Sequence, residues 1–155
     1  MKGLAEGGHP QSAARVAGLV QGTLARDPEA AWSRLKPYLE YQRDSYNSLA
    51  IEGTGQPAPP AIDADSYRVA SGPGELPRFL LATPEEAAAL LRPRLEKVPV
   101  SHIYFWASIA GMPDDLVDEH VGLLTGELEP KLRDVFQDTR PAAQPPSAQR
   151  SPYAS

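Results

Sequence analysis

Prolines divide this sequence into parts that can and cannot form regular secondary structure. The chain has 17 prolines among its 155 residues, about double the average usage of roughly 5%. Five fall within residues 53–77 and four within residues 138–155. Both stretches have few large apolar side chains to bury, so we expect a long Pro/Gly-rich loop over residues 53–77 and a disordered tail over residues 138–155. The fold must then be a single domain within residues 1–137.

Composition excludes several classes of function. The chain has no cysteine, so it has no disulfide, no thiolate nucleophile and no cysteine-ligated metal centre. Its formal net charge of −5 argues against binding to nucleic acid or to an anionic membrane. No stretch approaches the ~20 apolar residues that span a bilayer. We therefore expect a cytoplasmic protein without a nucleic-acid or membrane partner.

The first half of the chain predicts a strand followed by a long helix. Residues 14–25 alternate small apolar positions with positions of mixed polarity, which is typical of a strand. Asp27 then supplies an N-cap, and Pro28 is suited to the first helical position. These signals predict a helix over residues 28–50.

The second half predicts two further strands, each followed by a helix. Residues 79–81 form a short apolar run, and Thr83 and Glu86 after it have the spacing of a capping box, which starts a helix. Residues 100–109 are apolar on both sides, as expected of a strand that is buried on both faces. Strands that alternate with helices predict an α/β fold with parallel strands.

The last helix begins with a cluster of acidic residues. Residues 114–119 have the DDxxD spacing that also occurs where magnesium ions hold a diphosphate. We interpret them instead as acids that oppose the helix dipole, and we expect no metal site. The apolar stripe of this helix comprises Val117, Val121, Leu124, Leu128, Leu132 and Val135.

The histidines and serines do not form a recognisable catalytic pattern. His9, His102 and His120 have no second ligand at a metal-binding spacing, so they are expected at the surface or its boundary, where one could still orient a substrate. The serines lack the GxSxG context of a nucleophile. The catalytic residues therefore stay unknown.

The end of the strand at residues 100–109 carries the best candidates for a binding site. Functional groups of alternating α/β folds collect at the C-terminal ends of strands. Trp106, Ser108 and Met112 lie there, and their ring, hydroxyl and flexible thioether suit the wall of a cofactor or substrate pocket. The structural alternative, with Trp106 in the core and Met112 filling a loop, fits the sequence equally well.

The order of these segments resembles a known family. The sequences FLLATPEEAAALL, PVSHIYFWASIAGMPDDLVDEHVGLL and ELEPKLRDVF follow one another as in the C-terminal part of the bacterial-luciferase-like flavin-dependent oxidoreductases. In that family a short strand and a "GTPEE"-type capped helix lead to the last barrel strand, a "GMP" turn and a closing helix. Ala82 stands where many members have glycine. The resemblance covers roughly residues 4–136.

The resemblance implies a fold, a cofactor and a partner. The family is built on a TIM (β/α)8 barrel of ~250 residues, so this chain would be the C-terminal part of such a barrel, incomplete as a single chain. It implies FMN or a deazaflavin as cofactor, a small organic substrate, and oxidoreductase or monooxygenase activity that requires an N-terminal half-barrel or self-association. Trp106, Ser108 and Met112 would line the flavin or the substrate. The alternative is a non-catalytic half-barrel interaction module that binds a partner through its open strand edges.

Overall fold

The computed structural model describes residues 6–8, 16–98 and 100–137. Along the chain the principal elements are β1 (Val16–Val20), β2 (Gly22–Leu24), α2 (Pro28–Ile51), the 3-10 helix η2 (Ala64–Arg68), β3 (Leu80–Ala82), α3 (Pro84–Leu95), β4 (Val100–Phe105), α4 (Asp114–Leu123), the π-helical segment η3 (Leu124–Leu128) and α5 (Glu129–Gln137). The tail expected over residues 138–155 and His9 lie outside the described residues.

The strands are short and parallel. β1 pairs with β4, with Val20 opposite Phe105, and β2 pairs with β3, with Leu24 opposite Ala82. The single strand expected over residues 14–25 is therefore wrong: two strands separated at Gln21 each have their own partner, and residues 14 and 15 lie outside the described part. The described residues form a mixed arrangement of helices and small parallel sheets and close no barrel.

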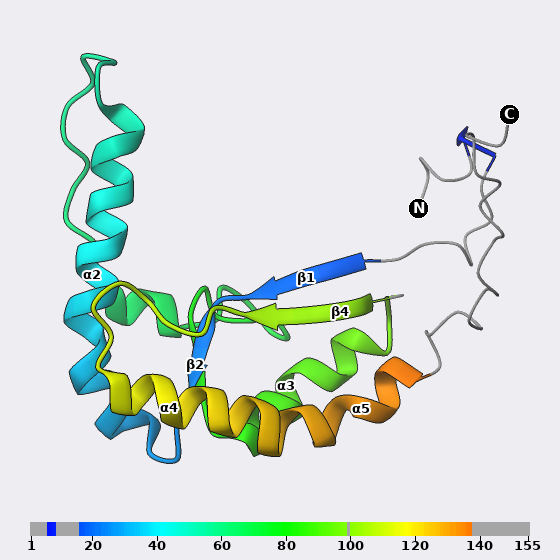
Figure 1. Cartoon of the computed structure of the whole chain (residues 1–155). Helices are drawn as coiled ribbons and strands as arrows, with labels where there is room; N and C mark the ends of the chain where they lie inside the picture. The colour runs from blue at the N-terminus through cyan, green and yellow to red at the C-terminus, as the bar shows by residue number, and fades with distance from the viewer. Residues whose placement is uncertain (1–5, 9–15, 99, 138–155) are drawn as a thin grey trace, which may run out of the picture.

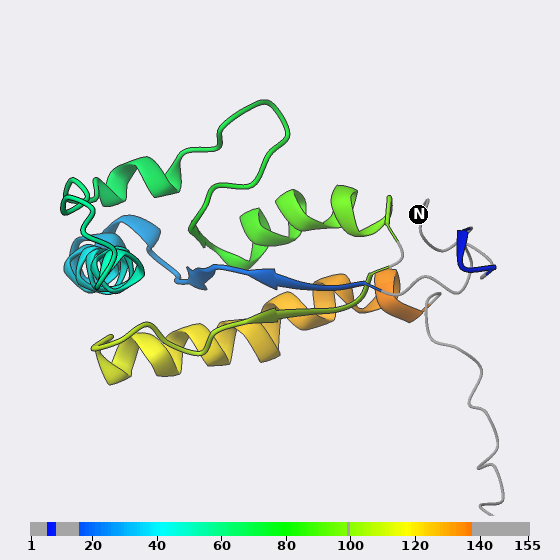
Figure 2. The ribbon, with the colours of Figure 1, turned by 90° about the horizontal axis from the view of Figure 1, so that it is seen from above.

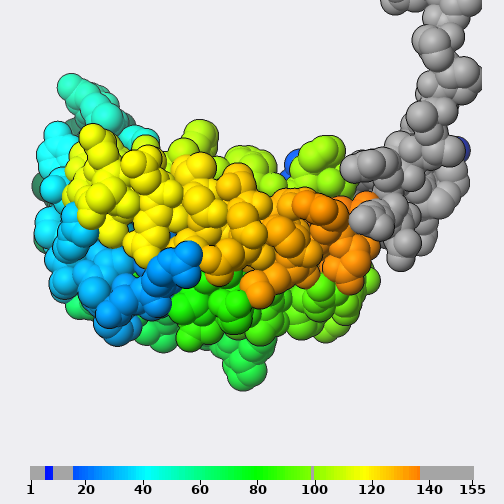
Figure 3. Space-filling view, turned by 60° about the horizontal axis from the view of Figure 1, so that its bottom comes forward, coloured from blue at the N-terminus to red at the C-terminus, as the bar shows by residue number. Residues whose placement is uncertain are grey.

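Helices cover one face of the strands. In Figure 1, α3 and the continuous rod formed by α4, η3 and α5 lie below β1 and β4, and α2 stands at the end where these strands stop. The view from above places α3 and the rod on either side of the strands (Figure 2). Figure 3 shows this helical side as a continuous layer of side chains from the start of α2 across the rod to α3. No described element covers the opposite face of β1 and β4 (Figure 1).

Alternate residues of β1 and β4 consequently have different environments. Val20 and Val100 are buried, and Phe105 packs against the core beneath the strands. Tyr104 on the other face is 48% exposed, and Leu19 is 38% exposed. The expectation that residues 100–109 form a strand buried on both faces is wrong, because β4 ends at Phe105 and only one of its faces meets helices.

The helix starts read from the sequence are confirmed. The Asp27 side chain accepts a hydrogen bond from the backbone N–H of Ala30 at 3.0 Å, and α2 begins at Pro28. At the start of α3, the N–H of Glu86 donates to Thr83 Oγ1 at 3.3 Å, and Glu86 accepts from the N–H of Thr83 at 2.9 Å. These local interactions satisfy N–H groups that a helix cannot satisfy by itself.

The segment over residues 53–77 is not a loop throughout. It contains η2, whose Ala64 is completely buried. Asp65 of η2 accepts hydrogen bonds from Trp32 Nε1 at 2.7 Å and from Lys36 Nζ at 2.6 Å, both on α2. Although the sequence offers little apolar material here, these polar contacts hold the segment against α2.

In α4, the buried positions of the last helix are shifted by one residue from those expected from the sequence. The buried side chains of α4 are Leu116, His120 and Leu123, whereas Val121, expected in the stripe, is 37% exposed. A π-helical turn contains one residue more than an α-helical turn, so η3 shifts the stripe by one position, and Leu128 beyond the shift is buried as expected. The same shift places His120, expected at the surface or its boundary, completely inside the protein.

Candidate functional site

A cavity of about 370 Å³ lies at the ends of the strands. It is bounded by the β1–β2 junction, by the second half of α2, and by the segment that follows β4. Its lining residues are Leu19, Gln21, Gly22, Thr23, Leu39, Gln42, Arg43, Tyr46, Phe79, Trp106, Ser108 and Ile109. We call it the strand-end cavity. It combines apolar walls with a few polar side chains, as is typical of small-molecule sites.

Two of the three predicted site residues line this cavity. Trp106 is 60% exposed, and its ring packs edge-on against Tyr104 with 6.5 Å between the centroids. Ser108 lies two residues further along the same wall. Met112 does not line the cavity, because it is 6% exposed and belongs to the core cluster around α2 and α4. The structure therefore brings Trp106 and Ser108 together and places Met112 in a packing position.

Polar residues of the cavity that the sequence analysis did not select come from the strand interruption and from α2. The side-chain oxygen of Gln21 accepts a hydrogen bond from Arg43 Nη2. Leu35 and Leu39 are buried on the inward face of α2, and one turn further this face continues with Gln42, Arg43 and Tyr46. This change from apolar to polar residues at helical spacing is the sequence signal that could have pointed to the site.

His120 holds the strand ends in place. Its Nδ1 accepts a hydrogen bond from the N–H of Leu24 at 2.9 Å, and its Nε2 lies 3.1 Å from the carbonyl oxygen of Trp106, to which it donates. The carbonyl of Gln21 accepts from the N–H of Leu80, and the N–H of Ala25 donates to the carbonyl of Ala82, both within β3. The N–H of Leu24 therefore faces the opposite edge of β2. The imidazole therefore provides an acceptor for an N–H at the unpaired edge of β2, and it connects this edge to the residue that follows β4.

The two partners of His120 also define its protonation state. One is a backbone donor and the other a backbone acceptor, so the imidazole is neutral with its proton on Nε2. Burial lowers the pKa of His120 below its ordinary value, an effect that the hydrogen bond to Trp106 partly opposes. At neutral pH His120 is thus an uncharged link that positions the backbone of Trp106, a cavity residue.

The acidic residues at the start of α4 make contacts within the fold. Asp115 accepts two hydrogen bonds from Arg34, each of 2.8 Å, and this guanidinium lowers the pKa of Asp115. Glu119 accepts from the backbone N–H of Arg26 at 3.0 Å. The part of the chain that the structure describes contains no group of three His, Asp or Glu side chains able to hold a metal ion.

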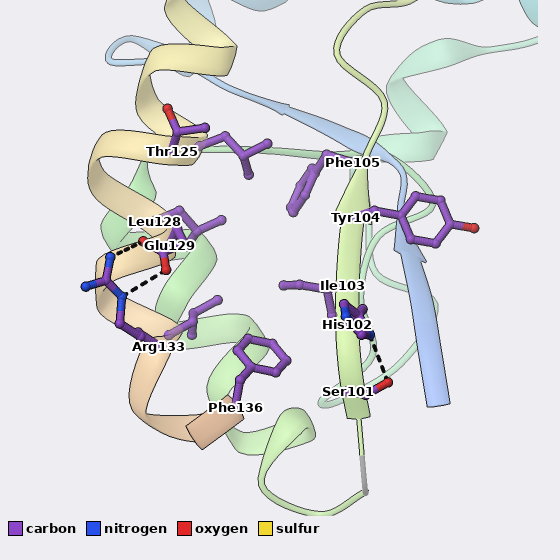
Figure 4. A pocket seen from close by; sticks show the side chains of 12 residues that line it. Ser101, His102, Ile103, Tyr104, Phe105, Thr125, Leu128, Glu129, Arg133 and Phe136 are labelled. Carbon is purple, nitrogen blue, oxygen red and sulfur yellow. Dashed lines mark hydrogen bonds and ion pairs between the residues drawn. The ribbon is translucent and has the colours of Figure 1, made fainter. Parts of the chain in front are cut away.

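A second hollow lies between β4 and the helical rod. It has a volume of about 520 Å³, and Figure 4 shows Ile103 and Phe105 pointing into it while Tyr104 points away. The helical wall contributes Leu128 and Phe136, and the pair of Glu129 and Arg133, 2.6 Å apart, lies at the rim. We call it the β4–α5 groove. Its largely apolar lining suits packing rather than chemistry.

The described residues that line the strand-end cavity include no nucleophile paired with a base. The indole, hydroxyl, amide and guanidinium groups of this cavity suit a planar molecule with polar substituents. No protein-family model matches the chain, and a search of the curated proteins found no match. Among the described residues, no helix is both long enough and apolar enough to span a membrane.

Proposed function

We propose that this chain is the C-terminal portion of a luciferase-like flavin-dependent oxidoreductase or monooxygenase. FMN or a deazaflavin would be the cofactor, and the substrate would be a small organic molecule. The observation that carries the proposal is the strand-end cavity, which lies next to the uncovered face of parallel strands whose other face is covered by helices. A cytoplasmic location, expected from the sequence, is part of this proposal.

Parallel strands with helices on one face support the barrel interpretation, whereas the pairing of β4 with β1 departs from a barrel in which each strand pairs with the next along the chain. Such a barrel has helices outside, side chains of the strands inside, and its active site at the C-terminal strand ends. Here α3 and the rod would be the outer layer, and Leu19 and Tyr104 would face the interior. The strands that close the barrel would come from an N-terminal half-barrel, or a second copy of this chain would cover the open face.

Within this proposal the cavity residues have distinct roles. The exposed ring of Trp106 would stack against the flavin or the substrate, and Ser108 would donate or accept a hydrogen bond at its edge. His120 would act on the cofactor only through the backbone of Trp106, since its two ring nitrogens are already occupied. Met112 supports α2 and α4 from the core. When bound, a flavin would supply hydride or electron transfer.

The β4–α5 groove favours a second candidate, a non-catalytic interaction module. Ile103, Phe105 and Phe136 are only partly buried there (Figure 4), and a groove of this kind accepts an apolar segment of a partner. In this case the groove and the open strand face would be the functional surfaces. The two candidates differ in whether the strand-end cavity binds a flavin.

Titration with oxidised FMN tests the proposed function. We expect weak but saturable quenching of FMN fluorescence, because the proposal assigns the remaining contacts of the site to an N-terminal half-barrel. Trp106→Ala should abolish the quenching, and Ser108→Ala should weaken it. Tyr41→Ala, which removes an exposed ring that does not line the cavity, is the matched control. Saturable quenching that survives Trp106→Ala would contradict the site, and no quenching by the wild-type chain would favour the interaction module.

A further inference from the structure

The C-terminal end of α2 extends beyond the body of the protein. Figure 1 shows α2 standing across the ends of β1 and β4, with its last turns on the side of the strands opposite to α3 and the rod. Residues 46–50 are all exposed. Among them are two large apolar side chains, Tyr46 and Leu49, which are 57% and 64% exposed. We call residues 46–51 the α2 end.

The apolar side of the α2 end faces the space above the strands. Gln42 and Tyr46 line the strand-end cavity, which identifies the side of α2 that is turned toward β1 and β4. Leu49 lies seven residues, or about two turns, after Gln42 and therefore on the same side. The returning chain lies behind the helix, where Asp44 accepts a hydrogen bond from the N–H of Ile62 at 3.1 Å.

The α2 end and the open face of β1 and β4 form an apolar corner. Leu19 and Trp106 line the strand-end cavity as Tyr46 does, so the two surfaces meet there. Leu19, Tyr104 and Trp106 leave much of their surface exposed. Contiguous apolar surface of this kind is typical of contacts with another protein.

The segments that form this corner contain no charged residue. No Asp, Glu, Lys or Arg occurs in β1 (VAGLV), in β4 (VSHIYF) or in the α2 end (YNSLAI), although 23% of the whole chain is charged. The rod, by contrast, displays ion pairs such as that of Glu129 with Arg133. Two copies of the chain, each with a net charge of −5, meet at this corner without bringing like charges together. A charged partner would leave its own charges unpaired there.

We propose that two copies of the chain form a symmetric dimer through this corner. A two-fold axis perpendicular to both α2 and the strands stacks the two open faces with their strands antiparallel. Each α2 end then stands beside the far end of the partner's open face, with Leu49 next to the partner's His102. The α2 end is about 9 Å long at 1.5 Å per residue, close to the ~10 Å that separates packed sheets. It therefore covers the end of the partner's strands without holding the open faces apart.

This inference rests on the part of the proposed function in which a second copy covers the open face, and it adds the α2 end as a second contact surface. Leu49 does not line the strand-end cavity, so a change at Leu49 separates the dimer from the flavin site. A failure to bind FMN would leave the dimer unaffected. A monomeric chain would leave the flavin proposal to an N-terminal half-barrel.

Sedimentation equilibrium of the full chain at several concentrations measures the dissociation constant of the dimer. We expect Leu49→Lys to raise this constant at least about tenfold, because it places an unpaired charge in the contact. Asn47→Lys is the matched control, since Asn47 is also exposed on the α2 end but lies on the other side of the helix. It should dimerise as the wild type does. Both changes are at exposed positions, so both variants should unfold at the wild-type urea concentration.

A charge pair tests which surfaces meet. His102→Glu alone should also weaken the dimer, because its carboxylate would lie against Leu49 of the second copy. When Leu49→Lys and His102→Glu chains are mixed, the mixed dimer contains one Lys–Glu contact and one unaltered contact, whereas either chain alone makes two altered contacts. The mixed dimer should therefore form at least about tenfold more tightly than either pure dimer.

Four results would overturn the inference. A wild-type chain that stays monomeric throughout the micromolar range would exclude the dimer. Wild-type dimerisation of Leu49→Lys would show that the open faces pack without the α2 end. The absence of a preferred mixed dimer would reject the contact between Leu49 and the partner's His102. Equal weakening by Asn47→Lys would assign the effect to added charge rather than to the apolar side of the α2 end.

Discussion

The two faces of the β1–β4 pair contrast in what covers them. On the helical face, Val20 and Val100 are buried, and Phe105 packs against α-helical side chains and lies 5.9 Å from the ring of His120. On the open face, Leu19 of β1 and Tyr104 of β4 leave much of their apolar surface exposed. Both faces carry apolar side chains, but the described helices pack against only one of them (Figure 1).

This contrast separates residues that stabilise the chain from residues that serve another molecule. Contiguous apolar surface on a protein usually marks a binding site. The open face of β1 and β4 also adjoins the strand-end cavity, which contains Trp106. Under the proposed function, the helical face serves folding and the open face serves partner and ligand binding, and the following predictions test that division.

The largest loss of stability is expected from His120→Ala. The change leaves a hollow and removes the partners of the Leu24 N–H and the Trp106 carbonyl. It should lower the free energy of unfolding by about 3–5 kcal/mol, measured by urea denaturation. His120→Gln, which can both accept and donate, should lose less, and His102→Ala on the open side of β4 should lose little. Equal stability of the two His120 variants would contradict the linking role.

The same substitution on the two faces should have different effects. Leu128→Ala removes a buried side chain of the helical layer and should cost about 2–5 kcal/mol of unfolding free energy. Leu19→Ala removes a side chain from the open face and should cost less than about 1 kcal/mol in the monomer. Urea denaturation at low protein concentration compares them. Comparable losses would mean that the open face is part of the folded core.

A smaller effect is expected at the start of α3, which packs on the helical side. Thr83→Ala removes the side chain that caps the N–H of Glu86 and should cost about 0.5–2 kcal/mol. Thr83→Ser keeps the hydroxyl and should be almost neutral. If the alanine variant unfolds at the same urea concentration as the wild type, the capping box has no role in stability.

The pH dependence of stability should report the burial of His120. Its pKa is lowered in the folded state, so the unfolded chain binds a proton more readily. Its contribution is therefore complete above the unfolded pKa of about 6.5 and is lost as the pH falls through that value toward the folded pKa. Between pH 7.5 and 5, the contribution of His120 to the slope of the unfolding free energy against pH should not exceed about 1.4 kcal/mol per pH unit. His120→Gln should remove this slope, and an unchanged slope would contradict the assignment.

Local interactions could be predicted from the sequence, whereas the partners of strands could not. The N-caps Asp27 and Thr83 act within one helical turn, and both starts are confirmed. The break at Gln21 was missed because it arises from pairing with two different strands. The docking of η2 was missed because it depends on hydrogen bonds between Asp65 and α2, far apart in the sequence.

The candidate site was predicted only in part for similar reasons. The sequence could select Trp106 and Ser108, which line one cavity, because position after a strand is a property of the sequence. For Met112 the sequence fitted a pocket wall and a packing role equally well, and the structure places it in the core. His120 was expected at the surface or its boundary but is completely buried, because the π turn at η3 shifts the register of the helix and helical spacing assumes a constant period.

The central claim, that the open face of β1 and β4 is built to be covered, is tested most directly by sedimentation velocity. At micromolar concentration the wild-type chain should self-associate, and the double variant Leu19→Lys with Tyr104→Lys should sediment as a monomer. Val121→Lys, which alters an exposed apolar residue of the helical rod, should associate as the wild type does. A wild-type monomer with a sharp, cooperative thermal transition would contradict the claim.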